Sequence, residues 1–116
     1  MTIRESGQRF LEDEDESVSI QSLERIARAL GGFLEYLERT GVTDAAALSI
    51  EDVRAYLLVD FPGTRPTSQA RSDVWFVTKR FLKWLGLRKQ SKIYGEFKLC
   101  ADELRQGFLN ACSESR

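Results

Sequence analysis

Apolar residues recur every three or four positions through most of this chain, the spacing that places side chains on one face of an α-helix. The first such pattern predicts a helix from Ser19 or Ile20 to Thr40. Gly31 and Gly32 fall inside it, and each costs about 1 kcal/mol relative to Ala in a helix interior. A close approach of a second helix, or a bend, would explain the pair. The expected buried stripe is Leu23, Ile26, Ala27, Leu30, Phe33, Leu34 and Leu37.

Three further helices are predicted downstream. Ser49 begins the first of them, and Asp52 stands three residues later, as in a capping box. This helix ends near Phe61, because Pro62 disfavours the helical conformation of the residue before it. The three helices are expected to span Ser49–Phe61, Pro66 or Thr67 to Gly86, and Ser91 to about Ala111, with one helical turn or a loop at residues 44–48.

No segment alternates apolar and polar residues as a half-buried strand does, so the pattern predicts an all-α protein, a bundle of four to five helices. Tyr56 falls on the buried stripe of its helix. Trp84 fits a core or half-buried position. Trp75 fits either the core or an exposed stacking position, and the core is the simpler assignment.

The two ends of the chain are expected to lie outside the folded domain. Residues 1–17 contain the run EDEDE at positions 12–16, which repels itself and offers little to bury, so they are predicted to form a disordered acidic tail. The helical domain then spans residues 18–112, and residues 113–116 form a short C-terminal tail.

The composition argues against several classes of function. The chain of 116 residues fits one domain, and it has no histidine and only two cysteines. No Ser-His or Cys-His pair, zinc site or nucleotide-binding glycine loop can be assembled, so we expect no catalytic residue, no metal and no cofactor. No apolar run reaches the length of a membrane span, and no secretory signal is visible, so no membrane association is expected.

The cysteines also indicate a compartment. Cys100 and Cys112 lie twelve residues apart in one predicted helix, about 18 Å at the helical rise. That separation is too large for a disulfide within a straight helix. We therefore expect reduced thiols in a cytoplasmic protein.

Charge is distributed very unevenly although the net charge is only −1. Residues 1–18 carry two arginines against six carboxylates, whereas residues 62–98 carry nine lysines and arginines against two carboxylates. The electrostatic field at a surface is set by nearby charges, because salt screens beyond about 8 Å under physiological conditions. The acidic sequence pI therefore does not exclude a polyanionic partner.

The basic residues gather on the predicted helix that begins at Thr67. Arg71, Lys79 and Lys83 lie off its apolar line, and Thr67 and Ser68 sit at its N-terminus, where free N–H groups favour phosphate. Each cation placed against a phosphate releases counterions and strengthens binding to DNA. A solvated helix face with no ligand remains the alternative explanation of the same charges.

Several segments together resemble the N-terminal core-binding domain of tyrosine recombinases, the SAM-like domain of phage integrases and of Xer-type and Cre-type recombinases. They cover roughly residues 19–87. The segments are FLEYLERTG at 33–41, LSIEDVRAYL at 48–57, PTS at the start of the long helix, and KRFLKWLGL at 79–87.

The resemblance implies a helical bundle that forms one half of a clamp around a recombination site. It also implies that the start of the first helix and the start of the long helix face the DNA. Lys83 joins the set on charge alone. The DNA-binding candidates are Ser19, Gln21, Ser22, Arg25, Arg28, Arg65, Thr67, Ser68, Arg71, Lys79 and Lys83.

The chain departs from the family in three ways. The Arg, Lys, His and Tyr active-site set of the family's catalytic domain cannot be assembled without histidine. The long helix is about two residues longer than usual, and RKQSK at 88–92 replaces the usual Asn-Pro exit. We therefore expect either a fragment of a recombinase or a stand-alone relative.

The first functional hypothesis is a DNA-binding module that holds double-stranded DNA and performs no chemistry, located in the cytoplasm at the nucleoid. No small-molecule substrate is expected. The alternative is a protein-interaction domain that docks a recombinase subunit or another partner through the C-terminal helix, where Phe108 and Leu109 are adjacent. In that alternative the acidic tail acts as a DNA mimic or an autoinhibitor. A helical domain with no ligand is the third possibility.

Overall fold

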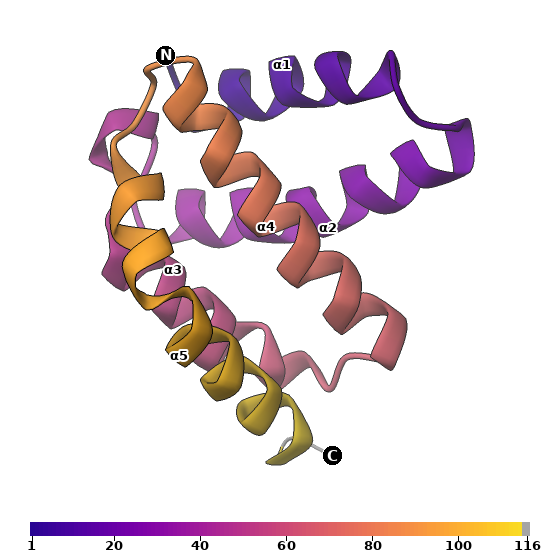
Figure 1. Ribbon diagram of the computed structural model, residues 1–116, viewed down its shortest axis with the longest axis vertical. Coiled ribbons are helices and arrows are strands. Elements are labelled where there is room, and N and C mark those ends of the chain that lie inside the picture. The colour runs from indigo at the N-terminus through magenta and orange to yellow at the C-terminus, as the bar shows by residue number, and fades with distance from the viewer. Residues whose placement is uncertain (115–116) are drawn as a thin grey trace.

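The computed structural model describes residues 1–114 and consists of five α-helices joined by short turns (Figure 1). No strand occurs among these residues, so the prediction of an all-α bundle of four to five helices is confirmed. None of the described helices is long and apolar enough to cross a membrane. The helices are α1 (Ile3–Asp15), α2 (Ile20–Arg39), α3 (Ile50–Ala55), α4 (Ser68–Leu87) and α5 (Ile93–Glu114).

Helix α1 corrects the prediction of a disordered tail over residues 1–17. Thr2 and Glu5 form a capping box, in which the Thr2 hydroxyl accepts from the Glu5 N–H at 3.0 Å. Ile3 and Phe10 lie seven residues apart on one face of the helix and are each 1% exposed. The folded domain therefore begins near residue 2 rather than at residue 18, because these two side chains belong to the core.

Helix α2 begins one residue after Ser19, whose hydroxyl accepts from the Ser22 N–H at 3.2 Å. Gly32 explains the glycine pair in its interior. A Cβ at this position would lie 2.9 Å from the Tyr56 hydroxyl, so only glycine lets α2 approach that ring. Gly31 meets nothing within 4 Å. The predicted close approach is thus confirmed at one glycine of the pair.

The segment after α2 contains several tight turns. The predicted turn at 44–48 is a short 3-10 helix (Ala45–Ala47), and the capping box of Ser49 and Asp52 opens α3 as expected. Helix α3 then widens into a π-helical turn (Tyr56–Asp60), closed by the bond from the Phe61 N–H to the Tyr56 carbonyl at 2.8 Å. A 3-10 turn (Pro62–Thr64) leads to α4.

Helix α4 starts after Thr67, whose hydroxyl accepts from the Ala70 N–H at 3.1 Å. It continues through Gly86 and ends at Leu87, one residue past the predicted stop. Lys89 makes the following turn with a φ of 58°. Gly86 itself is an ordinary helical residue, and a Cβ there would make a normal van der Waals contact with Tyr94 of α5 at 3.5 Å.

Helix α5 begins at Ile93 rather than Ser91 and runs to Glu114, so residues 113 and 114 are helical rather than a tail. Residues 115 and 116 of that predicted tail lie outside the described residues. Cys112 is 1% exposed, and no disulfide joins it to Cys100. Phe108 is likewise 1% exposed, so it is core and offers no docking surface.

Helix α4 is the central element of the bundle. It crosses α2 and packs against α1 on one side and α5 on the other (Figure 1). The Phe10 ring meets the Phe81 ring with centroids 5.4 Å apart, and Trp75 lies 5.8 Å from the rings of both Phe97 and Phe108. Trp75 is half-buried against the core, which agrees with the simpler of its two assignments.

Candidate functional site

The eleven predicted DNA-binding residues do not form one cluster. Helix α4 separates them. Arg25, Arg28 and Thr67 line a pocket between α2 and α4. Ser68, Arg71 and Lys79 line a cleft between α4 and α5 on the other side of the helix. Lys83 borders a basic hollow near the α4–α5 turn, Arg65 is exposed in a turn with a φ of 55°, and Ser19, Gln21 and Ser22 lie at the start of α2.

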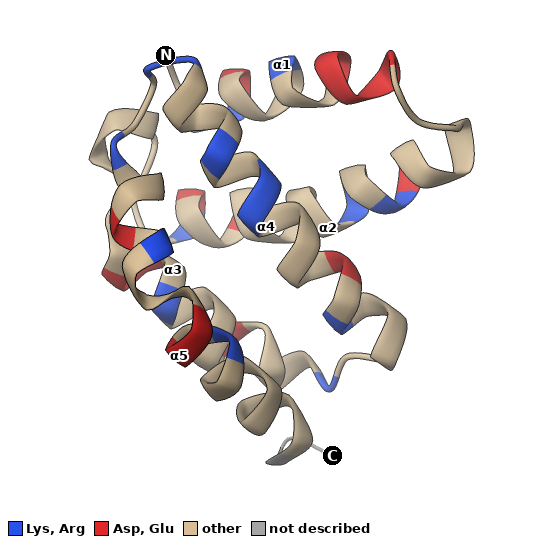
Figure 2. Ribbon diagram, in the orientation of Figure 1, with Lys and Arg blue, Asp and Glu red and all other residues tan. Residues whose placement is uncertain are grey.

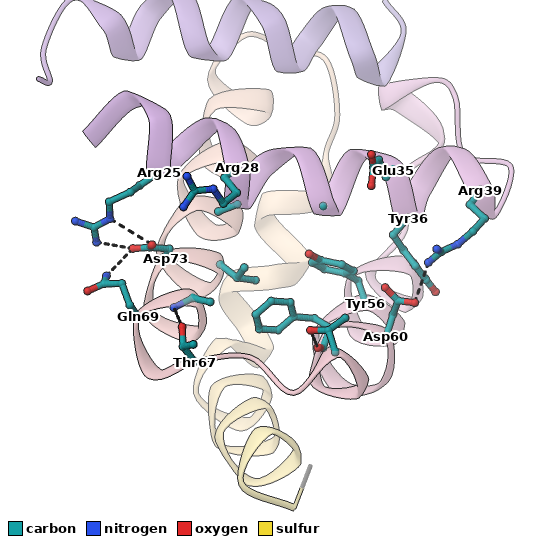
Figure 3. A pocket seen from close by; sticks show the side chains of 16 residues that line it. Arg25, Arg28, Glu35, Tyr36, Arg39, Tyr56, Asp60, Thr67, Gln69 and Asp73 are labelled. Carbon is teal, nitrogen blue, oxygen red and sulfur yellow. Dashed lines mark hydrogen bonds and ion pairs between the residues drawn. The ribbon is translucent and has the colours of Figure 1, made fainter. Parts of the chain in front are cut away.

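The α2–α4 pocket has a volume of about 620 Å³ and is drawn in Figure 3. Its lining comes from α2, from the turns after α3 and from the first turns of α4. Its apolar lining includes the buried side chains of Ala29, Phe61 and Val74. Charged side chains of α2 and α4 stand around it (Figure 3).

An ion pair closes one end of the α2–α4 pocket. The Arg25 guanidinium donates to the Asp73 carboxylate at 2.7 and 3.3 Å, and the Gln69 amide donates to the same carboxylate at 2.9 Å (Figure 3). The Arg25 hydrogen bond lowers the pKa of Asp73 below its ordinary value. Arg25 is therefore engaged within the chain, and a phosphate would have to displace Asp73 to bind it.

The other end of the α2–α4 pocket is also paired. Arg39 donates to Asp60 at 2.8 Å. Between the two pairs, Arg28 and Glu35 line the rim without an ion-pair partner among the described residues. Three arginines thus face three carboxylates around this pocket, and the balance of charge does not favour a polyanion.

Tyr56 lies at the centre of the α2–α4 pocket and points its hydroxyl into it (Figure 3). The residue is 3% exposed, and the rings of Phe33 and Tyr36 hold it at centroid distances of 5.1 and 5.4 Å. Burial raises the pKa of its phenol well above the ordinary value. Tyr56 therefore remains a neutral side chain at physiological pH.

Two basic residues, one on α4 and one directly after it, are neutralised by α1. Arg80 donates to both carboxylate oxygens of Glu14, at 2.6 and 2.8 Å. Arg88, which follows the helix, donates to Asp13 at 2.7 Å, and the Trp84 indole N–H donates to the same carboxylate at 2.6 Å. These pairs use the acidic run that the sequence alone assigned to a free tail.

The outer face of α4 keeps its charge. Lys79 and Lys83, the α4 ridge, are exposed and lie one turn apart, and neither forms an ion pair with a described residue. Figure 2 shows basic residues on two successive turns of α4 that face the viewer. The acidic end of α1 lies at the upper right of the same view. This ridge connects two basic hollows.

The two hollows lie at opposite ends of the α4 ridge. The α4–α5 cleft measures about 530 Å³ and contains Arg71 and Lys79 of α4 with Arg105 of α5. The hollow near the α4–α5 turn measures about 870 Å³ and is lined by four lysines and one carboxylate, Glu96. Its lysines are Lys83, Lys89, Lys92 and Lys98.

Sequence reasoning missed two residues of the α4–α5 cleft. Arg105 was not selected, because only the packing of α5 against α4 brings it near Arg71 and Lys79. Phe76 was missed although it is 52% exposed. Helical spacing carried a usable signal, since Phe76 shares the outer face of α4 with Lys79 and Lys83.

The chemistry available to this surface is ionic and aromatic. Among the described residues, no group of three or more His, Cys, Asp or Glu side chains is placed to hold a metal ion. Lysine, arginine and serine side chains around the exposed ring of Phe76 are suited to phosphate and base contacts. We compared the chain with known proteins, and no family model, no curated protein and no solved structure matched it.

Proposed function

We propose that this protein binds double-stranded DNA through the α4 ridge and the basic residues at its two ends, and that it performs no chemistry itself. The observation that carries the proposal is the selective pairing of the α4 cations. The ion pair with Glu14 neutralises Arg80, whereas Lys79 and Lys83 form no ion pair with a described residue. Charges left unpaired on a small surface are available to phosphate.

The dimensions of this surface suit a DNA backbone. The basic residues of α4 extend from Arg71 in the α4–α5 cleft to Lys83 of the α4 ridge, twelve residues or about 18 Å along the helix axis. Phosphates of one strand are several ångströms apart, so this basic stretch is long enough to meet several of them. The protein would follow the backbone, and such contacts carry little sequence information.

The resemblance to the core-binding domain of tyrosine recombinases gives the proposal a biological setting. In that setting the protein grips a recombination site in the cytoplasm at the nucleoid, and the catalytic tyrosine lies outside this chain. The start of α2 takes a smaller part than the resemblance implies. Arg25 is already bound to Asp73, so Arg28 and the α4 ridge supply the contacts.

Fluorescence anisotropy with a short labelled duplex tests this proposal. We expect the double variant Lys79→Ala/Lys83→Ala to bind the duplex at least about tenfold more weakly than the unchanged protein at low salt. The matched control for the single variant Lys79→Ala is Arg9→Ala, which removes an exposed cation of α1 that forms no ion pair with a described residue and should cost much less. Equal losses in these two single variants would reduce the effect to net charge and contradict the proposal.

A protein-docking role for α5 is the second candidate. Leu99 is 91% exposed and Leu109 is 43% exposed, both on the C-terminal helix that the alternative hypothesis assigned to a partner. A recombinase subunit would cover them. Two results together would favour this role over the first: no affinity of the protein for DNA, and loss of its binding to a recombinase in the variant Leu99→Ser.

A further inference from the structure

The α4–α5 cleft differs from the α2–α4 pocket and from the hollow near the α4–α5 turn in having no carboxylate among its described lining residues. Arg71, Lys79 and Arg105 line it, and none of the described side chains around it is a carboxylate. The α2–α4 pocket, by contrast, balances arginines with carboxylates. A cleft with this charge favours an anionic ligand over a neutral or cationic one.

The cations of the cleft come from two helices. Arg71 is half-buried and donates to the Ser68 hydroxyl at 2.8 Å, while Lys79 is exposed two turns further along α4. Arg105 approaches from α5. None of the three forms an ion pair with a described residue. The serine hydroxyls of Ser72 and Ser113 add hydrogen-bonding groups on both sides of the cleft.

Aromatic rings supply the other half of the cleft. The inner wall contains Trp75 and Phe108, whose ring centroids lie 5.8 Å apart. Phe76 stands at the edge with 52% of its surface exposed, an unusual degree of exposure for this side chain. The Arg80 guanidinium lies 5.2 Å from the Phe76 ring centroid, and Glu14 holds that guanidinium in place.

We propose that the α4–α5 cleft binds an unpaired nucleotide of a single strand, with its base against Phe76 and its flanking phosphates on Arg71, Lys79 and Arg105. Exposed aromatic rings beside a basic groove are the physical requirement for holding single-stranded nucleic acid without reading its sequence. A duplex keeps its bases stacked inside, so it can use the cations of the cleft but not the ring. The inference rests on the proposed function, since both assign the α4 surface to a nucleic acid.

A comparison of two probes tests this inference. The first is a labelled oligothymidylate of about twelve nucleotides, and the second is an abasic strand with the same number of phosphates. We expect the protein to bind the oligothymidylate about tenfold more tightly than the abasic strand, because only the former can stack. Equal affinity for the two strands, or no binding to either, overturns the inference.

Two matched variants assign the effect to the cleft. Phe76→Ala should remove the preference for bases and leave duplex affinity within about twofold, whereas Phe76→Trp should retain the preference. Leu99→Ala removes an even more exposed apolar side chain, one of α5 that lines neither the cleft nor the hollow near the α4–α5 turn, and should change neither. A preference that survives Phe76→Ala overturns the inference, while duplex binding that depends on Lys79 and Lys83 would still leave the proposed function intact.

Discussion

Arg80 of α4 and Glu14 of α1 are 66 residues apart in the chain and share two short hydrogen bonds, of 2.6 and 2.8 Å. The Glu14 side chain is 8% exposed, so the pair lies at the edge of the core rather than free in solvent. The pair fastens the acidic end of α1 to the helix that carries most of the candidate DNA contacts. It also neutralises one of the basic residues of that helix.

Neutralising Glu14 should therefore strengthen DNA binding. In Glu14→Gln the side chain keeps its shape but loses its charge, which leaves Arg80 free to meet a phosphate. We expect duplex affinity to rise about two- to fivefold at low salt. The control is Glu12→Gln, which makes the same charge change on the same helix at an exposed residue without an ion pair among the described residues. An equal rise in both variants would show that pairing with Arg80 does not matter.

Helix α1 should contribute substantially to stability. Phe10 is 1% exposed, and its ring packs against the rings of Phe81 and Trp84. We expect Phe10→Ala to lower the free energy of unfolding by about 3–5 kcal/mol, measured by urea denaturation. Leu99→Ala, at a side chain 91% exposed, should change it by less than about 0.5 kcal/mol. A disordered N-terminal segment would instead make the two variants equally stable.

The glycine pair of α2 offers an internal comparison. Gly32→Ala would place a Cβ 2.9 Å from the Tyr56 hydroxyl, and we expect it to destabilise the protein by about 1–3 kcal/mol. Gly31→Ala meets nothing within 4 Å and should stabilise the helix by up to about 1 kcal/mol. Thermal unfolding measures both. Shifts of the same sign would mean that Tyr56 does not constrain α2.

Most helix boundaries of this protein could be predicted from the sequence. Helix caps and apolar stripes are local features, so the pattern placed the ends of α2, α4, α5 and of α3 with its π-helical turn within a few residues. The pattern missed α1 because only Ile3 and Phe10 of its buried face are large apolar residues, and small or polar residues lie between them. Ser6 is fully buried, and a Cβ on Gly7 would lie 2.6 Å from the Leu34 side chain. Neither residue counts as hydrophobic in a periodicity argument.

The candidate site was harder to predict for a related reason. Charge and the family resemblance both nominated Arg25, but Asp73 lies 48 residues away in the sequence and binds it in the folded protein. Charge also nominated Lys79, and it stays unpaired within the described chain. Whether a basic residue is paired depends on which helices are in contact, and a local sequence pattern does not predict those contacts.

Stability should depend on pH through Asp73. The folded protein holds the pKa of this carboxyl below its ordinary value, because Arg25 and Gln69 donate to it. The stability it contributes is present above the unfolded pKa, about 3.9, and is lost as the pH falls through the folded pKa. We expect urea midpoints of the unchanged protein and of Asp73→Asn to converge between about pH 5 and pH 2. A difference that stays constant over that range would contradict the assigned cause.

The salt dependence of duplex binding tests the central claim most directly. Each cation that meets a phosphate contributes about −0.9 to the slope of log K against log salt concentration. We predict a slope of about −4 for the unchanged protein, reduced in magnitude by about 1.8 in Lys79→Ala/Lys83→Ala. A slope near zero, or one that the double variant leaves unchanged, would contradict the assignment of DNA binding to the α4 ridge.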